Sequence, residues 1–323
     1  MELVSKKRLE LYAGRSHPEL ARDIAAHLGV QLGNANLRRF ADSEDHCQFG
    51  ESVRGADVFI FQTHARPVND SIMEQCIMID AAKRASARRI TAVCPYLGYS
   101  RQDRKASGRE PISAKLVTDL LSVAGADRIV SVDLHASQIQ GFFDGPWDHL
   151  TAMPVLIDYL RSERLHDPVM VAPDAGRIKV AERFSQHLGW DLAFVYKRRP
   201  KGAPTQVEAV EVIGNVSGRT CVIIDDIVNT AGTICAAADL LMERGASEVW
   251  AAATHGVLSD PAVDRLKNSS LARVAVTDTL PIAPEKRFDK LEVLTVSGII
   301  AAAIDAVFAD TSVSEIFGGD NQV

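Results

Sequence analysis

Short apolar runs recur along the chain of 323 residues, and polar or Gly/Pro-containing turns bound most of them. Runs of this kind are typical of strands that are buried on both faces of a parallel sheet. They predict strands at residues 58–62, 90–95, 129–134, 169–173, 192–196, 221–225, 249–254 and 274–277. Helix-like stretches between them predict helices at residues 70–84, 113–123, 177–188, 234–244 and 261–267. This alternation favours an α/β fold with a mostly parallel sheet flanked by helices.

One strand–loop–helix–strand pattern occurs twice in the chain. Residues 55–62 and, after a helix, 84–93 parallel residues 218–225 and 244–252. We interpret this echo as two similar domains, residues 1–151 and residues 152–323. A chance likeness between two common units is the alternative.

Composition narrows the class of protein. Hydrophobic residues make up 46% and charged residues 24% of the chain, as in ordinary globular domains. No apolar run approaches the length of a membrane span, and the first residues lack the apolar core of a signal peptide. The five cysteines show no C-x-x-C spacing, so we expect a cytoplasmic protein with reduced cysteines and no zinc site. The formal net charge of −6 disfavours a nucleic-acid partner, and we expect no membrane partner either.

The most informative stretch is residues 225–233, which read Asp-Asp-Ile-Val-Asn-Thr-Ala-Gly-Thr between a predicted strand and a predicted helix. The free N–H groups and the positive dipole end of a helix N-terminus attract anions. Threonine hydroxyls add donors, and the Ala-Gly pair lets the backbone approach a ligand closely. Asp225 and Asp226 would repel a phosphate unless they bind a sugar diol or Mg²⁺. The pattern favours a ribose-phosphate site, and a solvated loop at a helix start is the alternative.

Other polar stretches follow predicted strands at the edge where open α/β sheets bind ligands. His135, within Asp-Leu-His-Ala-Ser-Gln, is suited to a metal or a nucleotide phosphate. Asp174, within Pro-Asp-Ala-Gly-Arg, is available to a Mg²⁺ shell. Lys197 and Arg199 precede the irregular stretch 200–206, which predicts a mobile loop able to bring cations to a reacting phosphate chain. A charged hairpin tip is the alternative.

Together, these stretches resemble the ribose-phosphate diphosphokinase family, also called phosphoribosyl pyrophosphate (PRPP) synthetases, over nearly the whole chain. The most specific motifs lie at residues 51–55, 99–105, 111–116 and 133–143, whereas the 225–233 motif is shared with all type I phosphoribosyltransferases. The resemblance implies two tandem type I phosphoribosyltransferase-like domains. It also implies a transferase of nucleotide biosynthesis that moves the β,γ-diphosphoryl group of Mg-ATP to the C1 hydroxyl of ribose 5-phosphate, giving PRPP and AMP.

The resemblance assigns roles to matching positions. It implies an ATP site made of Phe40, Asp42, Ser43, Glu44, Arg101, Gln102 and His135, with the adenine contacts often reaching across a subunit interface. It implies that ribose 5-phosphate is bound by Asp225, Asp226, Asn229, Thr230, Ala231, Gly232 and Thr233. Mg²⁺ would be held by His135 and Asp174, and Lys197 and Arg199 would be the catalytic cations.

The resemblance also implies assembly and regulation. We expect a homohexamer built from dimers, with the last helix of the chain packed on the N-terminal domain. Phosphate and ADP are the expected effectors. Their site would be formed at subunit contacts by Ser52, Arg54, Ser86, Arg109, Ser312, Ser314 and Phe317.

Several positions depart from the family pattern. Asn229 replaces the Asp that is common there, which removes a negative charge beside the 5-phosphate. Arg177 stands where many members have a second Gly, so we expect a narrower loop and an added cation near the diphosphate. Trp147 is bulkier than the usual residue at its position. Ser43 and residues 45–47 also differ from the family pattern on the adenine side of the ATP site.

Two other functions compete with this interpretation. A non-catalytic, PRPP synthetase-like regulatory subunit would be expected to lose loop or metal residues, yet Lys197, Arg199, His135 and Asp174 are all present. A simple phosphoribosyltransferase acting on a base would leave residues 99–105 and 133–148 unexplained.

Overall fold

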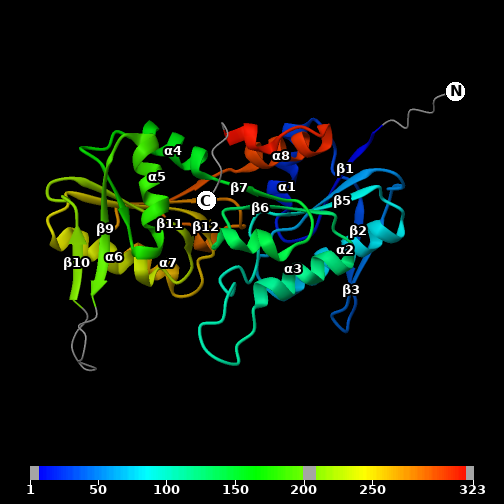
Figure 1. Ribbon diagram of the computed structural model, residues 1–323, viewed down its shortest axis with the longest axis horizontal. Coiled ribbons are helices and arrows are strands. Elements are labelled where there is room, and N and C mark those ends of the chain that lie inside the picture. Colours follow the sequence, from blue (N-terminus) through cyan, green and yellow to red (C-terminus); the bar gives the residue numbers. More distant parts are fainter. Residues whose placement is uncertain (1–6, 199–208, 318–323) are drawn as a thin grey trace. The chain divides into compact units, whose positions relative to one another are not determined.

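The computed structural model describes residues 7–198 and 209–317, with the backbone alone for residues 197, 198, 209 and 210. The chain divides into two compact units (Figure 1). The first takes in the chain up to Ala152, the stretch Thr279–Pro281 and the segment from Thr295 onward, and the second takes in Met153–Asp278 and Ile282–Leu294. Within the described ranges, no helix combines the length and the apolar character needed to cross a bilayer.

The first unit is built on a sheet of five parallel strands in the order β1-β4-β5-β6-β7. The strands are β1 (Leu9–Ala13), β4 (Asp57–Phe61), β5 (Arg89–Cys94), β6 (Arg128–Val132) and β7 (Trp147–Leu150). Side chains alternate across the sheet, so Val58 and Ile60 enter one core and Phe59 and Phe61 enter the other. Helices α2 (Val68–Arg84) and α3 (Ser113–Ala124) pack against the first core, and α1 (Pro18–Leu28) and α8 (Ser297–Ala309) against the second.

The second unit is built on a sheet of seven strands in the order β10-β9-β8-β11-β12-β13-β14, in which only the β10–β9 pair is antiparallel. The strands are β8 (Val169–Ala172), β9 (Asp191–Arg198), β10 (Ala209–Ile213), β11 (Thr220–Val228), β12 (Glu248–Gly256), β13 (Arg273–Thr277) and β14 (Leu291–Leu294). In β11, Ile223 enters the core beneath α6 (Gly232–Glu243) and α7 (Ala262–Asn268). Its neighbour Ile224 enters the core beneath α4 (Met153–Ser162) and α5 (Ile178–Leu188).

Shorter elements complete the two units. An antiparallel hairpin, β2 (Ala35–Arg39) and β3 (Asp45–Phe49), belongs to the first unit. The 3-10 turns are η1 (Ser137–Phe142), η2 (Ala175–Arg177), η3 (Pro284–Lys286) and η4 (Val313–Phe317).

The two sheets repeat one arrangement. The order β1-β4-β5-β6-β7 of the first sheet matches β8-β11-β12-β13-β14 of the second. Gly55 and Gly218, each just ahead of the second strand in that order, have φ of 71° and 74°. Each donates its N–H to the turn that follows the next helix, at Ser86 (2.9 Å) and Gly245 (2.7 Å) respectively. The echo in the sequence therefore reflects two copies of the same strand–helix–strand unit.

Each strand and helix predicted from the apolar runs is present, with ends that differ by a few residues. The prediction of mostly parallel sheets flanked by helices is confirmed. The sequence patterns did not predict β1, β2, β3, β7, β10, β14, α1, α4 or α8. Most of these strands lie at sheet edges or in the hairpin, where partial burial leaves no continuous apolar run.

Candidate active site

The ribose-phosphate candidates of the second unit meet because their strands are neighbours. β8 and β11 are parallel and adjacent, with Ile223 opposite Val171. The segments after their carboxyl ends, 173–177 and 229–233, therefore lie at one edge of the sheet. Asp174 caps η2, and its Oδ1 accepts the Gly176 N–H at 2.8 Å. The sequence predicted this edge from the order of strand and loop alone.

Arg177 lies across the two adjacent carboxylates of β11. Its Nε is 3.1 Å from Asp225 Oδ1, and its Nη2 is 2.6 Å from Asp226 Oδ1. Burial, and next the Asp226 carboxylate, raises the pKa of Asp225 to about 8, while Arg177 acts in the opposite direction. The structure pairs Arg177 with these two acids, and its expected place near the diphosphate stays a prediction.

The loop after β11 forms a helix N-terminus suited to an anion. Ala231, at φ 60°, is the N-cap of α6, whose first residue is Gly232. Among the residues that the structure describes, no side chain caps this helix start, and the first N–H groups of a helix can bind an anion. Arg265 fixes the loop by donating from Nη1 to the Thr230 carbonyl at 3.0 Å. The Oδ1 atom of Asn229 is buried and has no hydrogen-bond partner among the described residues.

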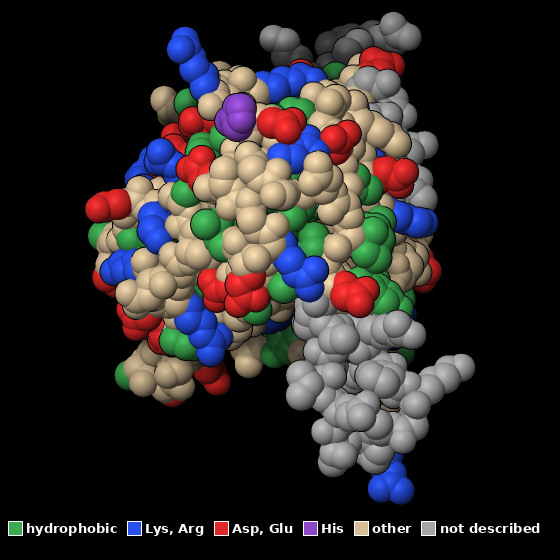
Figure 2. Space-filling view, turned by 90° about the vertical axis from the view of Figure 1, so that its left-hand side faces the viewer, with side chains coloured by type: hydrophobic (Ala, Val, Ile, Leu, Met, Phe, Trp, Pro, Cys, Tyr) green, Lys and Arg blue, Asp and Glu red, His purple; other side chains and the backbone are tan. Residues whose placement is uncertain are grey.

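The two proposed catalytic cations are only partly described. Lys197 lies in β9, where it pairs with Val210 of β10, and its side chain lies outside the described residues. Arg199 lies outside them altogether, so both roles stay predictions. Figure 2 looks onto the side of the second unit that carries β9 and β10, and on its coloured part Lys/Arg and Asp/Glu side chains are interspersed.

The adenine-side candidates form the turn of the β2–β3 hairpin in the first unit. Phe40, Asp42, Ser43 and Glu44 are all exposed, and 48% of Phe40 is accessible. The turn closes through the Phe40 N–H, which donates to the Glu44 carbonyl at 2.8 Å. Ser43 has a positive φ of 75°. The role of this turn as a contact surface for a base stays a prediction.

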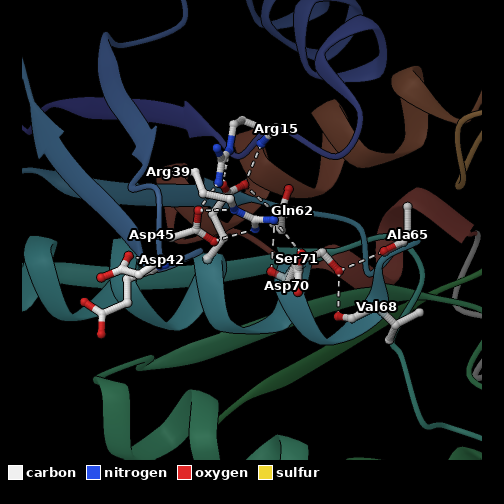
Figure 3. Close-up of polar contacts among 11 residues, drawn as sticks. Arg15, Arg39, Asp42, Asp45, Gln62, Ala65, Val68, Asp70 and Ser71 are labelled. Carbon is white, nitrogen blue, oxygen red and sulfur yellow. Dashed lines mark hydrogen bonds and ion pairs between the residues drawn. The ribbon is translucent and has the colours of Figure 1, made fainter.

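An ion-pair network holds the base of this hairpin (Figure 3). Arg39 pairs with Asp45 at 2.9 Å and with Asp70 of α2 at 2.7 Å. Arg15 pairs with Asp45 and with Glu74 of α2. A cavity of about 290 Å³ lies here, lined in part by Arg15, Arg39 and Glu74. Sequence reasoning missed this network, although Arg39 directly precedes the predicted adenine-side residues.

The motif at residues 99–105, which carries the ATP-side candidates Arg101 and Gln102, contacts the motif at residues 133–143. Arg101 and Gln102 lie in the exposed loop after β5, and the Gln102 side chain accepts from Ser113 Oγ at 2.7 Å. The neighbouring Asp103 accepts from Gln138 Nε2 of the second motif at 2.7 Å. His135 lies in the segment between β6 and η1, where it is partly buried.

The effector candidates fall into two described groups and one separate residue. The loop that carries Ser52 and Arg54 contacts the turn at Ser86, since Gly55 donates to the Ser86 carbonyl at 2.9 Å. In the second group, Ser312 and Ser314 share a hydrogen bond of 2.8 Å, and Phe317 ends η4. Arg109, with φ 70°, lies in the exposed loop before α3. The regulatory role of this set stays a prediction.

These features first define a class: an α/β protein of two phosphoribosyltransferase-like domains, with a candidate anion-binding loop at a helix N-terminus in the second. A family profile described as the N-terminal domain of ribose phosphate pyrophosphokinase matches residues 9–125, and the phosphoribosyl synthetase-associated domain matches residues 194–318. The ribose-phosphate pyrophosphokinase of Bifidobacterium longum is 57% identical over 315 residues, covering 96% of this chain and 93% of the relative. That of Streptomyces coelicolor is 51% identical and covers 98% of each.

A solved structure gives the same result. The phosphoribosylpyrophosphate synthetase of Mycobacterium smegmatis has a TM-score of 0.89 and 51% identity, covering 94% of this chain and 100% of that one. The chain belongs to the ribose-phosphate pyrophosphokinase family.

Proposed function

We propose that this enzyme transfers the β,γ-diphosphoryl group of ATP to the C1 hydroxyl of ribose 5-phosphate, giving PRPP and AMP. The observation that carries the proposal is identity of 57% to a ribose-phosphate pyrophosphokinase across 96% of the chain. The loop at 229–233, at a helix N-terminus beside two carboxylates, supplies the chemistry that a sugar phosphate requires.

The reaction needs positioning and charge rather than a protein nucleophile. The C1 oxygen forms a bond to the β-phosphorus, the bond from that phosphorus to the α–β bridging oxygen breaks, and AMP leaves with the electron pair. The proton of the C1 hydroxyl passes to solvent. Asp225 and Asp226 accept hydrogen bonds from ribose hydroxyls, and the N–H groups and hydroxyls of residues 230–233 hold the 5-phosphate. Lys197 and Arg199 stabilise the charge that develops on the transferred group.

We propose Mg²⁺ as the metal that accompanies ATP. Among the described residues no group of three or more His, Cys, Asp or Glu side chains forms a metal cage. Mg²⁺ commonly keeps its waters and binds one or two protein groups together with substrate phosphates, so a single imidazole or carboxylate is a sufficient protein ligand. His135 of the first unit and Asp174 of the second are the residues that would contribute, and the ion would neutralise phosphate charge.

Assembly, regulation and location belong to the same proposal. We propose a cytoplasmic homohexamer in which the exposed turn of residues 40–44 contacts the adenine bound by a neighbouring subunit. Phosphate and ADP would act at the surface that includes Ser52, Arg54 and Ser86. An exposed Phe40 supports a role for this turn in contacts beyond its own unit.

One assay tests the reaction against its competitors. AMP formation from ATP is measured with and without ribose 5-phosphate and with and without Mg²⁺. We expect AMP only when both are present. A non-catalytic regulatory subunit would form no AMP, and a simple phosphoribosyltransferase would consume PRPP rather than make it. Absence of ribose-dependent AMP would reject the proposed function.

A further inference from the structure

We propose that Arg177 is a positioning residue for ribose 5-phosphate: its guanidinium keeps the carboxylates of Asp225 and Asp226 aligned to accept hydrogen bonds from two neighbouring ribose hydroxyls. The inference rests on the proposed function and adds a residue to the sugar site.

Local backbone structure aims Arg177 at the two acids. The Asp174 carboxylate accepts the Gly176 N–H at 2.8 Å, and the Arg177 N–H donates to the Asp174 carbonyl at 3.2 Å. These two bonds fold residues 174–177 into the turn η2 directly after β8. Since β8 lies beside β11, the Arg177 side chain reaches the carboxyl-end residues of that strand.

The Arg177 guanidinium can align the two carboxylates because it contacts both of them. One nitrogen, Nε, faces Asp225 and another, Nη2, faces Asp226, so one planar group fixes the relative orientation of two carboxylates. The exposed fractions are 14% for the Arg177 side chain, 14% for Asp225 and 11% for Asp226. Little solvent therefore screens the three charges.

Charge balance explains why the sugar site needs this residue. Two adjacent carboxylates that are largely buried repel one another, and a cation in contact with both offsets part of that repulsion. The Asp226 N–H also donates to Asp225 Oδ1 at 2.8 Å, which fixes one acid against the backbone. Arg177 supplies the positive charge and the second point of attachment.

A buried arginine elsewhere in the same unit shows a different role. Arg219, with 9% of its side chain exposed, pairs with Asp167 and Asp191 next to the amino-terminal ends of β8, β9 and β11. Those acids lie at the opposite end of the strands from the ligand loops. Arg177, in contrast, pairs with acids at the carboxyl end, so its loss should affect one substrate selectively.

The test compares Arg177→Gln with the unaltered enzyme in the AMP assay, varying one substrate at a time. We expect the KM for ribose 5-phosphate to rise about tenfold while the KM for ATP stays within about twofold. Arg177→Lys keeps the charge without the two-point contact. Its KM for ribose 5-phosphate should therefore lie between the values for the unaltered enzyme and for Arg177→Gln. Lys179→Gln, which removes an exposed cation from α5, is the control and should leave both KM values unchanged.

Three results would overturn the inference: an unchanged KM for ribose 5-phosphate, a lowered one, or equal rises for both substrates. Calorimetric titration of ribose 5-phosphate with α,β-methylene-ATP present should show the same weakening in the Kd. If Arg177→Gln does not fold, Arg177→Lys decides, and an unchanged KM in that variant counts against the proposal. If the unaltered enzyme is active and the Arg177 variants have the same KM for ribose 5-phosphate as that enzyme, only this inference is rejected. Absence of turnover in the unaltered enzyme would reject the proposed function.

Discussion

The imidazole Nδ1 of His64 accepts a hydrogen bond from the backbone N–H of Gly98, with 2.9 Å between the two nitrogens. Because Nδ1 accepts, Nε2 carries the proton and donates to Gln75 Oε1 at 2.9 Å. Gln75 in turn donates to the Ile60 carbonyl of β4 at 3.1 Å. This buried chain of bonds ties the sheet and α2 to the start of the loop that carries Arg101 and Gln102.

The neutral state of His64 predicts a loss of stability in mild acid. Burial lowers the pKa of His64 to about 4, with the Gln75 hydrogen bond acting in the opposite direction, whereas an unfolded His has a pKa of about 6.5. The folded protein therefore resists protonation, so the stabilisation is complete above pH ~6.5 and declines as the pH falls toward 4, by about 3 kcal/mol in total.

Urea unfolding of the unaltered chain and of His64→Asn, followed from pH 7.5 to pH 4.5, checks this expectation. Asn keeps an acceptor for the Gly98 N–H in place of Nδ1, and it does not titrate in this range. We expect the unaltered chain to lose about 2–3 kcal/mol more than the variant over that interval. Parallel pH curves would show that His64 does not control the acid sensitivity.

The network at the base of the hairpin predicts a selective effect on ATP. Asp45 is 6% exposed and is shared by Arg15 and Arg39, so Asp45→Asn leaves two cations without their common carboxylate. We expect the turn of residues 40–44 to lose its fixed position and the KM for ATP to rise about 3- to 10-fold. The KM for ribose 5-phosphate should remain within about twofold, as measured by AMP formation.

Asp80→Asn is the matched control for that prediction. It breaks the exposed pair between Asp80 and Arg84 on α2, and exposed pairs of this kind contribute about 0.3–0.5 kcal/mol. Neither KM should change. Equal rises in the KM for ATP with Asp45→Asn and Asp80→Asn would show that general loss of charge, rather than the hairpin network, is responsible.

Features contained within one stretch of chain were predictable from sequence. β11 carries an apolar run followed by two acids, and a Thr-Ala-Gly-Thr stretch follows the strand, so strand, loop and helix start can be recognised together. The sheet orientation then follows, because parallel strands expose their carboxyl ends at a common edge. That residues 173–177 and 225–233 lie at the same edge of their sheet was predictable for this reason.

Pairings between distant stretches were not predictable, because they depend on strand order and register. Arg177 meets Asp225 only because β8 lies beside β11, and many other sheet orders are compatible with the same elements. Arg39 faces Asp45 because the β2–β3 register places these two residues opposite each other. Neither hairpin strand is predominantly buried, so no apolar pattern indicated that register.

Lys197 is expected to act on turnover rather than on binding. A preorganised charge that stabilises the transition state typically contributes about 3–4 kcal/mol, which corresponds to roughly a 10²- to 10³-fold change in rate. Lys197→Ala should therefore retain ribose 5-phosphate binding, measured by calorimetry, and lose turnover by that factor in the AMP assay. Near-normal turnover would remove Lys197 from the catalytic residues.

Restoring the carboxylate at position 229 separates its role in binding from its role in chemistry. Asn229 Oδ1 is buried without a donor among the described residues, so Asn229→Asp introduces a charge that no described group compensates. This charge lies in the proposed 5-phosphate loop and repels the phosphate. A repulsion of about 1 kcal/mol raises the KM for ribose 5-phosphate about fivefold. We expect kcat to stay within about twofold.

Salt dependence and a charge-matched variant make this last test specific. The rise in KM should shrink when the ionic strength is raised, since salt screens the interaction between the new carboxylate and the phosphate. Asn215→Asp adds the same charge at an exposed position of the second unit and should leave KM unchanged. A higher kcat in Asn229→Asp would instead assign a carboxylate at position 229 a part in the chemical step. An unaltered KM would place residue 229 outside the reach of the bound 5-phosphate.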